Sequence, residues 1–417
     1  MIDVRKLSTG ITIDGERLRL IELAGLVFLW QAAVGVYFLS LVQQYLPQAL
    51  DAGPAYTGYA MACYGTAKFL WQTPAGWIAD RIGRRITMVA GIALSITVLT
   101  AMLSVPDTRA FLICSALLGL GAATMWPAFM AHVGETTPHN RRARTMNVLN
   151  LAQMAGIGIG TLAGVLMVDF VTYGAAFWTC IGFNVLALVV VLRRSDATVR
   201  DATLVDDVSR SERADRDRSA WAPGIAMLAV IVLFLTVGTS LHTPMIGAYT
   251  HDVLEVKMSY MALLFPVPAL AAGVVMWKFS THADRFGRRA PLLAGIAVAA
   301  CCIFGLTLTR NPVIVVNLVV LAGLAYAISM PAWGAAALDA TDVGSRGLWL
   351  GALTAVQGLG VAGGQALGGV IGGVWGPLAP FKLAALLLMI AVALIAANQA
   401  HHARTRARHL PVNAPTT

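Results

Sequence analysis

The sequence predicts an all-α membrane protein whose twelve transmembrane helices form two six-helix bundles related by an internal repeat. Three observations predict this fold class: a strongly apolar composition, a regular alternation of apolar runs with basic loops, and a repeat that keeps one register across four helices. Of the 417 residues, 58% are hydrophobic and 12% are charged, whereas soluble domains carry about 25% charged residues. One soluble core could not bury so many long apolar stretches, but a lipid bilayer surrounds them with apolar material.

A helix that crosses a bilayer needs about 20 largely apolar residues. The first twenty residues lack the compact apolar region of a cleaved signal peptide, so we interpret them as a cytoplasmic tail. The chain then contains twelve stretches that meet the length requirement, and in order these predicted spans are 21–45, 56–79, 86–104, 110–134, 145–168, 173–193, 222–247, 259–280, 290–309, 312–336, 347–374 and 377–399.

Basic residues determine the predicted orientation of these spans. Alternate loops hold nearly all the arginines, and the other loops hold only Arg109, Lys257, Arg310 and, at a helix start, Lys382. Because basic loops stay in the cytoplasm, we predict a multi-pass protein of the inner (plasma) membrane with both termini cytoplasmic. The same rule accounts for the formal net charge of +9, so the charge does not indicate a nucleic-acid partner.

One long polar segment divides the chain. Residues 194–220 mix both charge signs and lack aromatic residues, which is typical of a linker with little fixed structure. The predicted domains are therefore a six-helix bundle over 1–193, a cytoplasmic linker over 194–220 and a second six-helix bundle over 221–417. The five cysteines all fall in apolar runs without a CxxC pair, so the sequence predicts neither a metal site nor a disulfide framework.

The two predicted bundles repeat one another. GWIADRIGRR ends the second span and FSTHADRFGRR ends the eighth, which places Asp284 204 residues after Asp80. Since each half has six spans, both halves enter the membrane from the same side, as a parallel repeat about an axis along the membrane normal. Bundles related in this way enclose a central site and open it to each side in turn, which favours a transporter over a static scaffold. The same separation holds without a gap for Gly83 and Gly287, Gly91 and Gly295, Gly119 and Gly323, Gln153 and Gln357, Gly156 and Gly360, Gly160 and Gly364, and Gly164 and Gly368.

The GxxxDRxGRR motif after the second span resembles the signature of the major facilitator superfamily. The resemblance covers the chain except its tails and linker, and it implies the major facilitator fold with a loop that helps to latch the outward-facing state. A simpler interpretation, in which the arginines only keep the loop in the cytoplasm, fits the same residues. The matching residues are Gly76, Asp80, Arg81, Gly83, Arg84 and Arg85, and in the second copy Asp284, Arg285, Gly287 and Arg288, with Ser280 replacing the first glycine.

The pattern is similar to that of the drug and small-molecule efflux members, a resemblance that implies export and proton antiport. Two of their signatures are incomplete, because Ser115 stands where the fourth span should have an arginine and Thr161 where the fifth should have a proline. The sequence therefore leaves proton coupling open. Glycines in the fifth and eleventh spans still predict close helix packing, at Gly156, Gly160, Gly164, Gly360, Gly364 and Gly368.

Charged groups within a membrane are costly, so each is a candidate for a functional site. Lys68 lies twelve residues before Asp80, roughly 18 Å from the cytoplasmic end of its helix. We expect Lys68 to face the central cavity, where it could bind an anionic group of a substrate or change its protonation. The competing interpretation is a lysine that pairs with backbone carbonyls or a neighbouring helix and has no part in transport.

No Asp or Glu lies at the middle of a predicted span. Coupling through Lys68, coupling through a histidine and no coupling at all therefore stay open. Glu22, just inside the first span, and His242, in the outer half of the seventh, are the other ionisable candidates. Uncharged polar residues within the spans are further candidates for lining the substrate site: Gln31, Gln72, Gln153 and Gln357.

Together these features predict a secondary active transporter, not an enzyme, that moves a small organic compound, anionic or amphipathic, by alternating access in the direction of efflux. The chain has no Walker A sequence, so ATP is not the direct energy source, and we predict no cofactor. The expected partners of this monomer are a small-molecule substrate and the lipid bilayer. The alternatives are a lipid or lysolipid transporter of the same fold, an importer of a nutrient or organic anion, and a membrane receptor that transports nothing.

Overall fold

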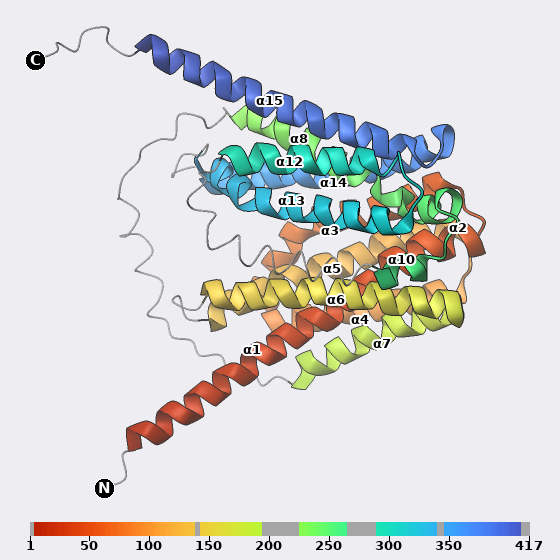
Figure 1. Ribbon diagram of the computed structural model, residues 1–417. Coiled ribbons are helices and arrows are strands. Elements are labelled where there is room, and N and C mark those ends of the chain that lie inside the picture. The colour runs from red at the N-terminus through yellow and green to blue at the C-terminus, as the bar shows by residue number, and fades with distance from the viewer. Residues whose placement is uncertain (1–3, 138–141, 194–224, 265–288, 340–345, 410–417) are drawn as a thin grey trace, which may run out of the picture. The chain divides into compact units, whose positions relative to one another are not determined.

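The computed structural model describes residues 4–137, 142–193, 225–264, 289–339 and 346–409. Every element in these ranges is helical, which confirms the predicted all-α fold class (Figure 1). The predicted linker, 194–220, lies outside the described residues. The chain forms two compact units: unit 1 comprises Met1–Val199 and Lys257–Leu263, and unit 2 comprises Arg200–Val256 and Leu264–Thr417.

Unit 1 contains the first six predicted spans. Helix α1 packs against α6 and α7, α3 packs against α5, and α4 packs against α5 and α7. Large buried side chains from several of these helices, such as Leu26, Met61 and Phe129, fill the core between them. The elements of this unit are α1 (Val4–Val36), the π-helix η1 (Tyr37–Tyr45), α2 (Leu46–Ala49), α3 (Pro54–Ile82), α4 (Arg84–Ser104), α5 (Thr108–Thr136), α6 (Arg142–Phe170), α7 (Tyr173–Arg193) and, but for its last residue, α10 (Met258–Leu264).

Unit 2 repeats the pairings of unit 1. Helix α8 packs against α14 and α15 as α1 packs against α6 and α7, and α12 packs against α13 and α15 as α4 packs against α5 and α7. Figure 1 shows α15 lying along α8 and α12. The elements of this unit are α8 (Ile225–Leu241), η3 (Thr243–Met245), α9 (Ile246–Ala248), η4 (Tyr249–Val253), α12 (Arg289–Gly305), α13 (Pro312–Asp339), α14 (Arg346–Trp375) and α15 (Ala379–His409).

Individual contacts recur at the separation of 204 residues that the sequence predicts. The ring centroids of Tyr45 and Phe177 are 5.1 Å apart in unit 1, and those of Tyr249 and Phe381, 204 residues later, are 5.0 Å apart in unit 2. A Cβ atom at Gly91 would meet the carbonyl of Gly121, and one at Gly295 would meet the carbonyl of Ala325. The repeat therefore builds the same helix pairs twice, as predicted.

Helix length and hydropathy fit a membrane protein. Within the described ranges, seven helices are long and apolar enough to cross a membrane. Helices α3 and α14 are also long, with 29 and 30 residues, but α3 carries Lys68 and α14 is rich in glycine, which lowers their hydropathy. The predicted eighth span, 259–280, is described only over α10.

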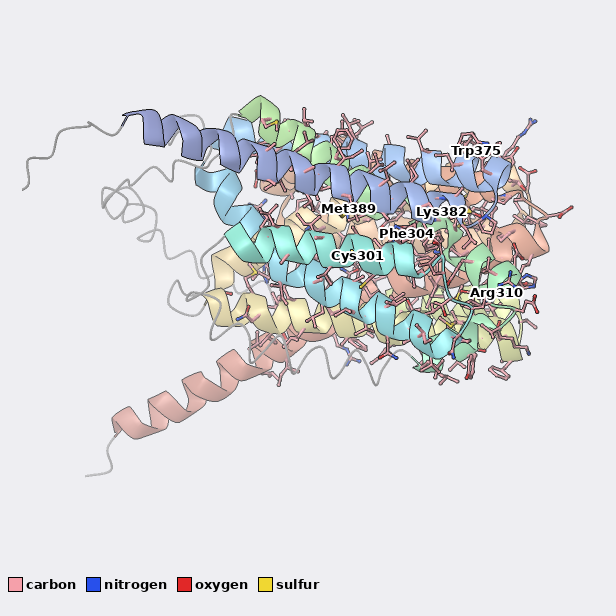
Figure 2. The ribbon with its side chains drawn as sticks, turned by 45° about the horizontal axis from the view of Figure 1, so that its top comes forward. Cys301, Phe304, Arg310, Trp375, Lys382 and Met389 are labelled. Atoms are coloured by element: carbon pink, nitrogen blue, oxygen red, sulfur yellow. The ribbon has the colours of Figure 1, made fainter. Side chains whose placement is uncertain are left out.

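Exposed side chains on unit 2 have the distribution expected at a lipid boundary. Cys301 and Met389 are exposed within their helices, whereas Arg310, Trp375 and Lys382 are exposed at or beside helix ends, together with Phe304 in the last turn of α12 (Figure 2). Apolar side chains face the acyl chains of a bilayer, and aromatic and basic side chains gather at its interfaces. The basic and aromatic side chains at this end are of the kinds that favour a membrane interface.

Candidate functional site

Lys68 is the middle residue of α3. The helix runs from Pro54 to Ile82, so the rise of 1.5 Å per residue places Lys68 about 21 Å from either end. The side chain is half-buried, and no described residue forms an ion pair or hydrogen bond with it. Gln72, also half-buried, lies one turn further along the same face of α3. The two side chains place an amine without a described partner beside an amide at mid-helix.

The other polar candidates divide between the two units. In unit 1, Gln31 is buried on α1, and Glu22 on α1 and Gln153 on α6 are half-buried. In unit 2, Gln357 is half-buried on α14, and His242 follows the last residue of α8. The Nδ1 atom of His242 is buried without a hydrogen bond to any described residue, and its ring lies 5.4 Å from that of Phe381.

A small cavity with a mostly apolar lining lies inside unit 1. Its volume is about 30 Å³, which accommodates one or two water molecules and no organic substrate. The hydroxyl of Tyr37, at the start of the π-helix, is buried there without a hydrogen bond to the part of the chain that the structure describes. The cavity is therefore too small to be a substrate site. Its lining includes Trp30, Tyr37, Tyr64, Ser95, Cys180 and Asn184.

The signature loop makes a sharp turn at Gly83. This residue alone separates α3 from α4, and its backbone angles are φ 104° and ψ 148°. Residues with a side chain avoid that region, although a Cβ at Gly83 would meet nothing within 4 Å. The carbonyl of Gly83 accepts a 2.8 Å hydrogen bond from the Thr87 hydroxyl in the first turn of α4. The glycine is needed for its conformation and not for space.

Charged side chains of the loop have separate partners. Asp80 forms an ion pair with Arg84 one turn away, and its side chain remains 63% exposed. The guanidinium of Arg81 lies 3.9 Å from the centroid of the Trp77 ring. Arg85 donates a 2.5 Å hydrogen bond to the Leu192 carbonyl near the end of α7. The loop is thus attached to α7 within unit 1, whereas Asp80 and Arg81 are exposed.

The second copy of the motif, with Asp284, Arg285, Gly287 and Arg288, lies outside the described residues. In the first copy, Gly76 faces α5, because a Cβ at this position would lie 4.0 Å from the Cβ of Pro127.

The glycines of α6 and α14 bring helices into backbone contact. A Cβ at Gly160 would overlap the Ala32 carbonyl of α1, and a Cβ at Gly364 would lie 2.9 Å from the Val237 carbonyl of α8. The same crowding occurs one turn before and after each of these glycines. The further pairs are Gly156 with Phe28, Gly164 with Ser40, Gly360 with Thr236 and Gly368 with Leu241.

Two features of unit 1 are not among the residues that the sequence analysis singles out. The Tyr45–Phe177 pair was detectable, because both residues recur 204 positions later as Tyr249 and Phe381. Asp169 was not singled out, because it follows the predicted end of the fifth span at residue 168. In the structure α6 continues to Phe170, and Asp169 accepts hydrogen bonds from two other segments.

Comparison with known proteins agrees with this architecture. Residues 23–319 and 279–414 match the Major Facilitator Superfamily. The proton-coupled antiporter flippase LtaA of Staphylococcus saprophyticus is 23% identical over 353 residues, which cover 83% of this chain and 85% of LtaA. LtaA of Staphylococcus aureus is 22% identical over 358 residues, which cover 83% of this chain and 86% of that protein.

Solved transporter structures have the same fold. A bacterial homologue of the human lysosomal transporter Spinster, in an inward-facing and unoccupied conformation, superposes with a TM-score of 0.67 at 13% identity, covering 92% of this chain and 97% of that one. The human organic anion transporter MFSD10 superposes with a TM-score of 0.61 at 16% identity, covering 91% of this chain and 99% of that one. With the family match spanning most of the sequence, this chain belongs to the major facilitator superfamily and is a multi-pass membrane transporter.

Proposed function

We propose that the protein exports a small organic anion with an apolar portion by alternating access, and that Lys68 binds the anionic group. The observation that carries this proposal is the half-buried Lys68 at the middle of α3, which has no partner among the described residues. A charged lysine at the centre of a bilayer costs about 2.5–3.5 kcal/mol to insert. A bound anionic substrate would offset that cost, which gives the lysine a reason to be there.

An amphipathic substrate is favoured over a fully water-soluble one. The LtaA relatives are named flippases and align along 83% of this chain, and a flippase moves molecules that have a polar and an apolar part. In unit 1, α1 and α5 also contribute a stacked aromatic pair, Trp30 and Trp126, with ring centroids 5.8 Å apart. A lipid or lysolipid with an anionic headgroup is the second candidate substrate.

The signature loop is proposed to act in the conformational cycle. With both termini in the cytoplasm, as the basic loops indicate, the turn at Gly83 lies on the cytoplasmic side. Arg85 attaches the turn to α7, while the exposed carboxylate of Asp80 is available for contacts that form when that side closes. Loss of this carboxylate would alter the rate of switching more than substrate affinity.

Proton coupling is part of the proposal because the LtaA relatives are named proton-coupled antiporters. Lys68, Glu22 and His242 are the ionisable groups of this chain that we propose for the coupling role. A pH gradient, acidic outside, should accelerate export, and its collapse should slow export.

A thermal-shift screen of the purified protein tests the substrate class. Anionic amphiphiles such as lysophosphatidylglycerol should raise the unfolding temperature of the native protein, because a ligand that binds only the folded state stabilises it. Lys68→Ala should lose this shift, and the zwitterionic analogue lysophosphatidylcholine should give a smaller one. Equal shifts for native protein and variant would show that Lys68 does not bind the anion.

A further inference from the structure

Helix α15 continues beyond the apolar stretch that is long enough to cross a membrane. The helix runs from Ala379 to His409, whereas its span-length apolar part is Ala379–Ala397. The twelve residues 398–409 therefore form a helical extension, which we call the α15 extension. Figure 1 shows this end of α15 running past the first turns of α8 and α12, its neighbours in unit 2, and Figure 2 shows the same from a second angle.

The α15 extension contains basic residues and no acidic ones. Its sequence, NQAHHARTRARH, has three arginines and three histidines, and no Asp or Glu follows Asp342 in the chain. The start of α1, which is cytoplasmic in the predicted orientation, is different, because Asp14 and Glu16 stand beside Arg17 and Arg19 there. The arginines of the α15 extension thus have no acidic residue on their own helix, so a partner that neutralises them comes from another segment or another molecule.

The basic positions cover most of the circumference of the α15 extension. In an α-helix, positions three or four apart share a face, so the extension has two neighbouring basic faces and one face of small residues. A helix with this distribution can turn a row of basic positions toward a charged surface over a wide range of tilts. The first basic face has His401, Arg404 and Arg408, the second has His402, Arg406 and His409, and the small face has Ala400, Ala403 and Ala407.

The α15 extension remains within electrostatic range of a membrane surface. With Ala397 at the edge of the hydrocarbon core, a rise of 1.5 Å per residue places Arg404 about 10 Å and Arg408 about 16 Å beyond that edge along the helix axis. The headgroup layer adds about 5–7 Å to each side of the core, and the field of an anionic surface reaches about 10 Å further. All three arginines therefore lie within that field even where α15 is perpendicular to the membrane.

The predicted linker is a weaker electrostatic match than the membrane. Residues 194–220 contain seven acidic and six basic residues, so the linker is close to neutral. A cytoplasmic leaflet that holds anionic phospholipids has a negative potential over its whole surface, and clusters of basic residues next to a transmembrane helix bind to it. Charge complementarity thus favours phospholipid headgroups over a segment of the same chain.

We propose that the α15 extension binds the anionic phospholipid headgroups of the cytoplasmic leaflet through Arg404, Arg406 and Arg408. These lipids are bound as a membrane partner and not as the transported compound, so the inference goes beyond the proposed function and does not depend on it. It uses the predicted orientation, in which both termini are cytoplasmic. The binding holds the end of the last helix at the membrane surface.

The test measures how close the α15 extension lies to the headgroups. The full chain, with a fluorophore attached at position 405 through an azide-bearing residue, is reconstituted in nanodiscs. One set of discs contains phosphatidylcholine alone and the other contains phosphatidylcholine with phosphatidylglycerol. Both sets contain the same fraction of a lipid with a nitroxide on its headgroup, which quenches nearby fluorophores. Because the two faces of a disc have the same lipids, the measurement depends neither on orientation nor on transport.

Quenching should be stronger in the phosphatidylglycerol discs, and high salt, which screens surface charge, should reduce it to the level in phosphatidylcholine. Each arginine should raise the ratio of bound to free extension about fivefold. The triple variant Arg404→Gln, Arg406→Gln and Arg408→Gln should therefore show no difference between the discs, whereas lysine at the same three positions retains the charge and should retain the difference. Lys382→Gln, at the opposite end of α15, should leave quenching unchanged.

Equal quenching of the native chain in the two kinds of disc would overturn the proposal, as would a difference that survives in the glutamine variant. A difference that high salt does not reduce would also contradict it, because the contact would then not be electrostatic. Size-exclusion chromatography shows whether the glutamine and lysine variants are equally well folded. Headgroup binding can fail while flux is normal, and it can be present while no tested compound is transported.

Discussion

Lys68 combines three properties that rarely occur together in a membrane helix: a positive charge, a position at mid-helix and no ion-pair partner among the described residues. A lysine that served only to hold helices together would be expected to have a carboxylate or several carbonyls around it. A lysine that binds and releases an anion must instead be unpaired between binding events. The structure of α3 therefore agrees better with the second role.

Replacing Lys68 by Ala should reduce transport at least a hundredfold while the protein folds and reaches the membrane normally, because the anionic group loses its counter-charge. Flux in proteoliposomes and the amount of folded protein measure the two effects separately. Lys382→Ala, which removes an exposed lysine at the end of α15 near Trp375, is the matched control and should transport at the native rate. Native flux in Lys68→Ala would refute the site.

Asp80→Asn should slow switching between states with little change in substrate affinity, because the carboxylate lies in the signature loop, at the end of α3, far from Lys68. The expected effect is about a tenfold lower maximal rate at an unchanged half-saturating concentration. Concentration-dependent flux separates the two quantities, with Asp51→Asn as a control at an exposed position at the other end of the helix. An unaltered maximal rate would show that Asp80 has no part in switching between states.

At the scale of helices, backbone contact between α1 and α6 depends on the absence of a side chain. A Cβ at Gly160 would overlap the Ala32 carbonyl, whereas Gly158, two residues before it on the same helix, has nothing within 4 Å of the corresponding position. Overpacking of this kind typically costs about 1–3 kcal/mol. The two glycines thus form a pair that differs in packing and shares the same helix.

Gly160→Ala should therefore lower the unfolding temperature by several degrees, and Gly158→Ala should leave it unchanged or raise it slightly, since alanine favours helix. Thermal unfolding in detergent, followed by size-exclusion chromatography, measures both. A Gly160→Ala protein as stable as the native one would mean that the two helices are farther apart than described.

The turn between α3 and α4 needs a glycine at position 83 because of the positive φ there, and not because a side chain would clash. Gly83→Ala should destabilise the folded protein by about 1–3 kcal/mol, because its positive φ is strained for any residue with a Cβ and the substitution adds no clash. Gly53→Ala, where φ is −59° and no atom lies within 4 Å, is the control and should be neutral. Equal stabilities for the two variants would contradict the conformation at Gly83.

Features of the fold that depend on local sequence could be predicted, whereas contacts between segments far apart in the sequence could not. Apolar length and basic loops act locally, so the spans and their order were readable from the sequence, as was the repeat that places Tyr45–Phe177 and Tyr249–Phe381 in equivalent pairs. The position of Lys68 at mid-helix also follows from counting residues. Bonds such as Arg85 to the Leu192 carbonyl join helices that are distant in sequence, and no local pattern specifies them.

Asp169 shows the same limit most clearly. A carboxylate just after an apolar run normally indicates that the span has ended, and only the fold reveals that α6 continues past it and that Gln44 and Ser259 donate to it. Whether a boundary residue is solvated or bonded depends on which other segment arrives there. That information lies in the packing of the helices and not in the composition of one span.

For the whole molecule, the two halves share a scaffold but not their chemistry. The helix pairs and glycine contacts recur in both units, whereas Lys68 aligns with Ala272 and Asp169 with Gly373. A repeat gives the two similar bodies that alternating access requires. The proposed binding lysine belongs to unit 1 and has no counterpart in the sequence of unit 2.

The most direct test of this account is flux of an anionic amphiphile through the reconstituted protein. Proteoliposomes containing fluorescent NBD-lysophosphatidylglycerol and an imposed pH gradient would be followed by dithionite quenching, beside vesicles with Lys68→Ala and vesicles without protein. We predict rapid movement only with the native protein, faster with the gradient than without it, and slower movement of the zwitterionic analogue. Movement at the protein-free rate for both probes, or equal movement with Lys68→Ala, would contradict it.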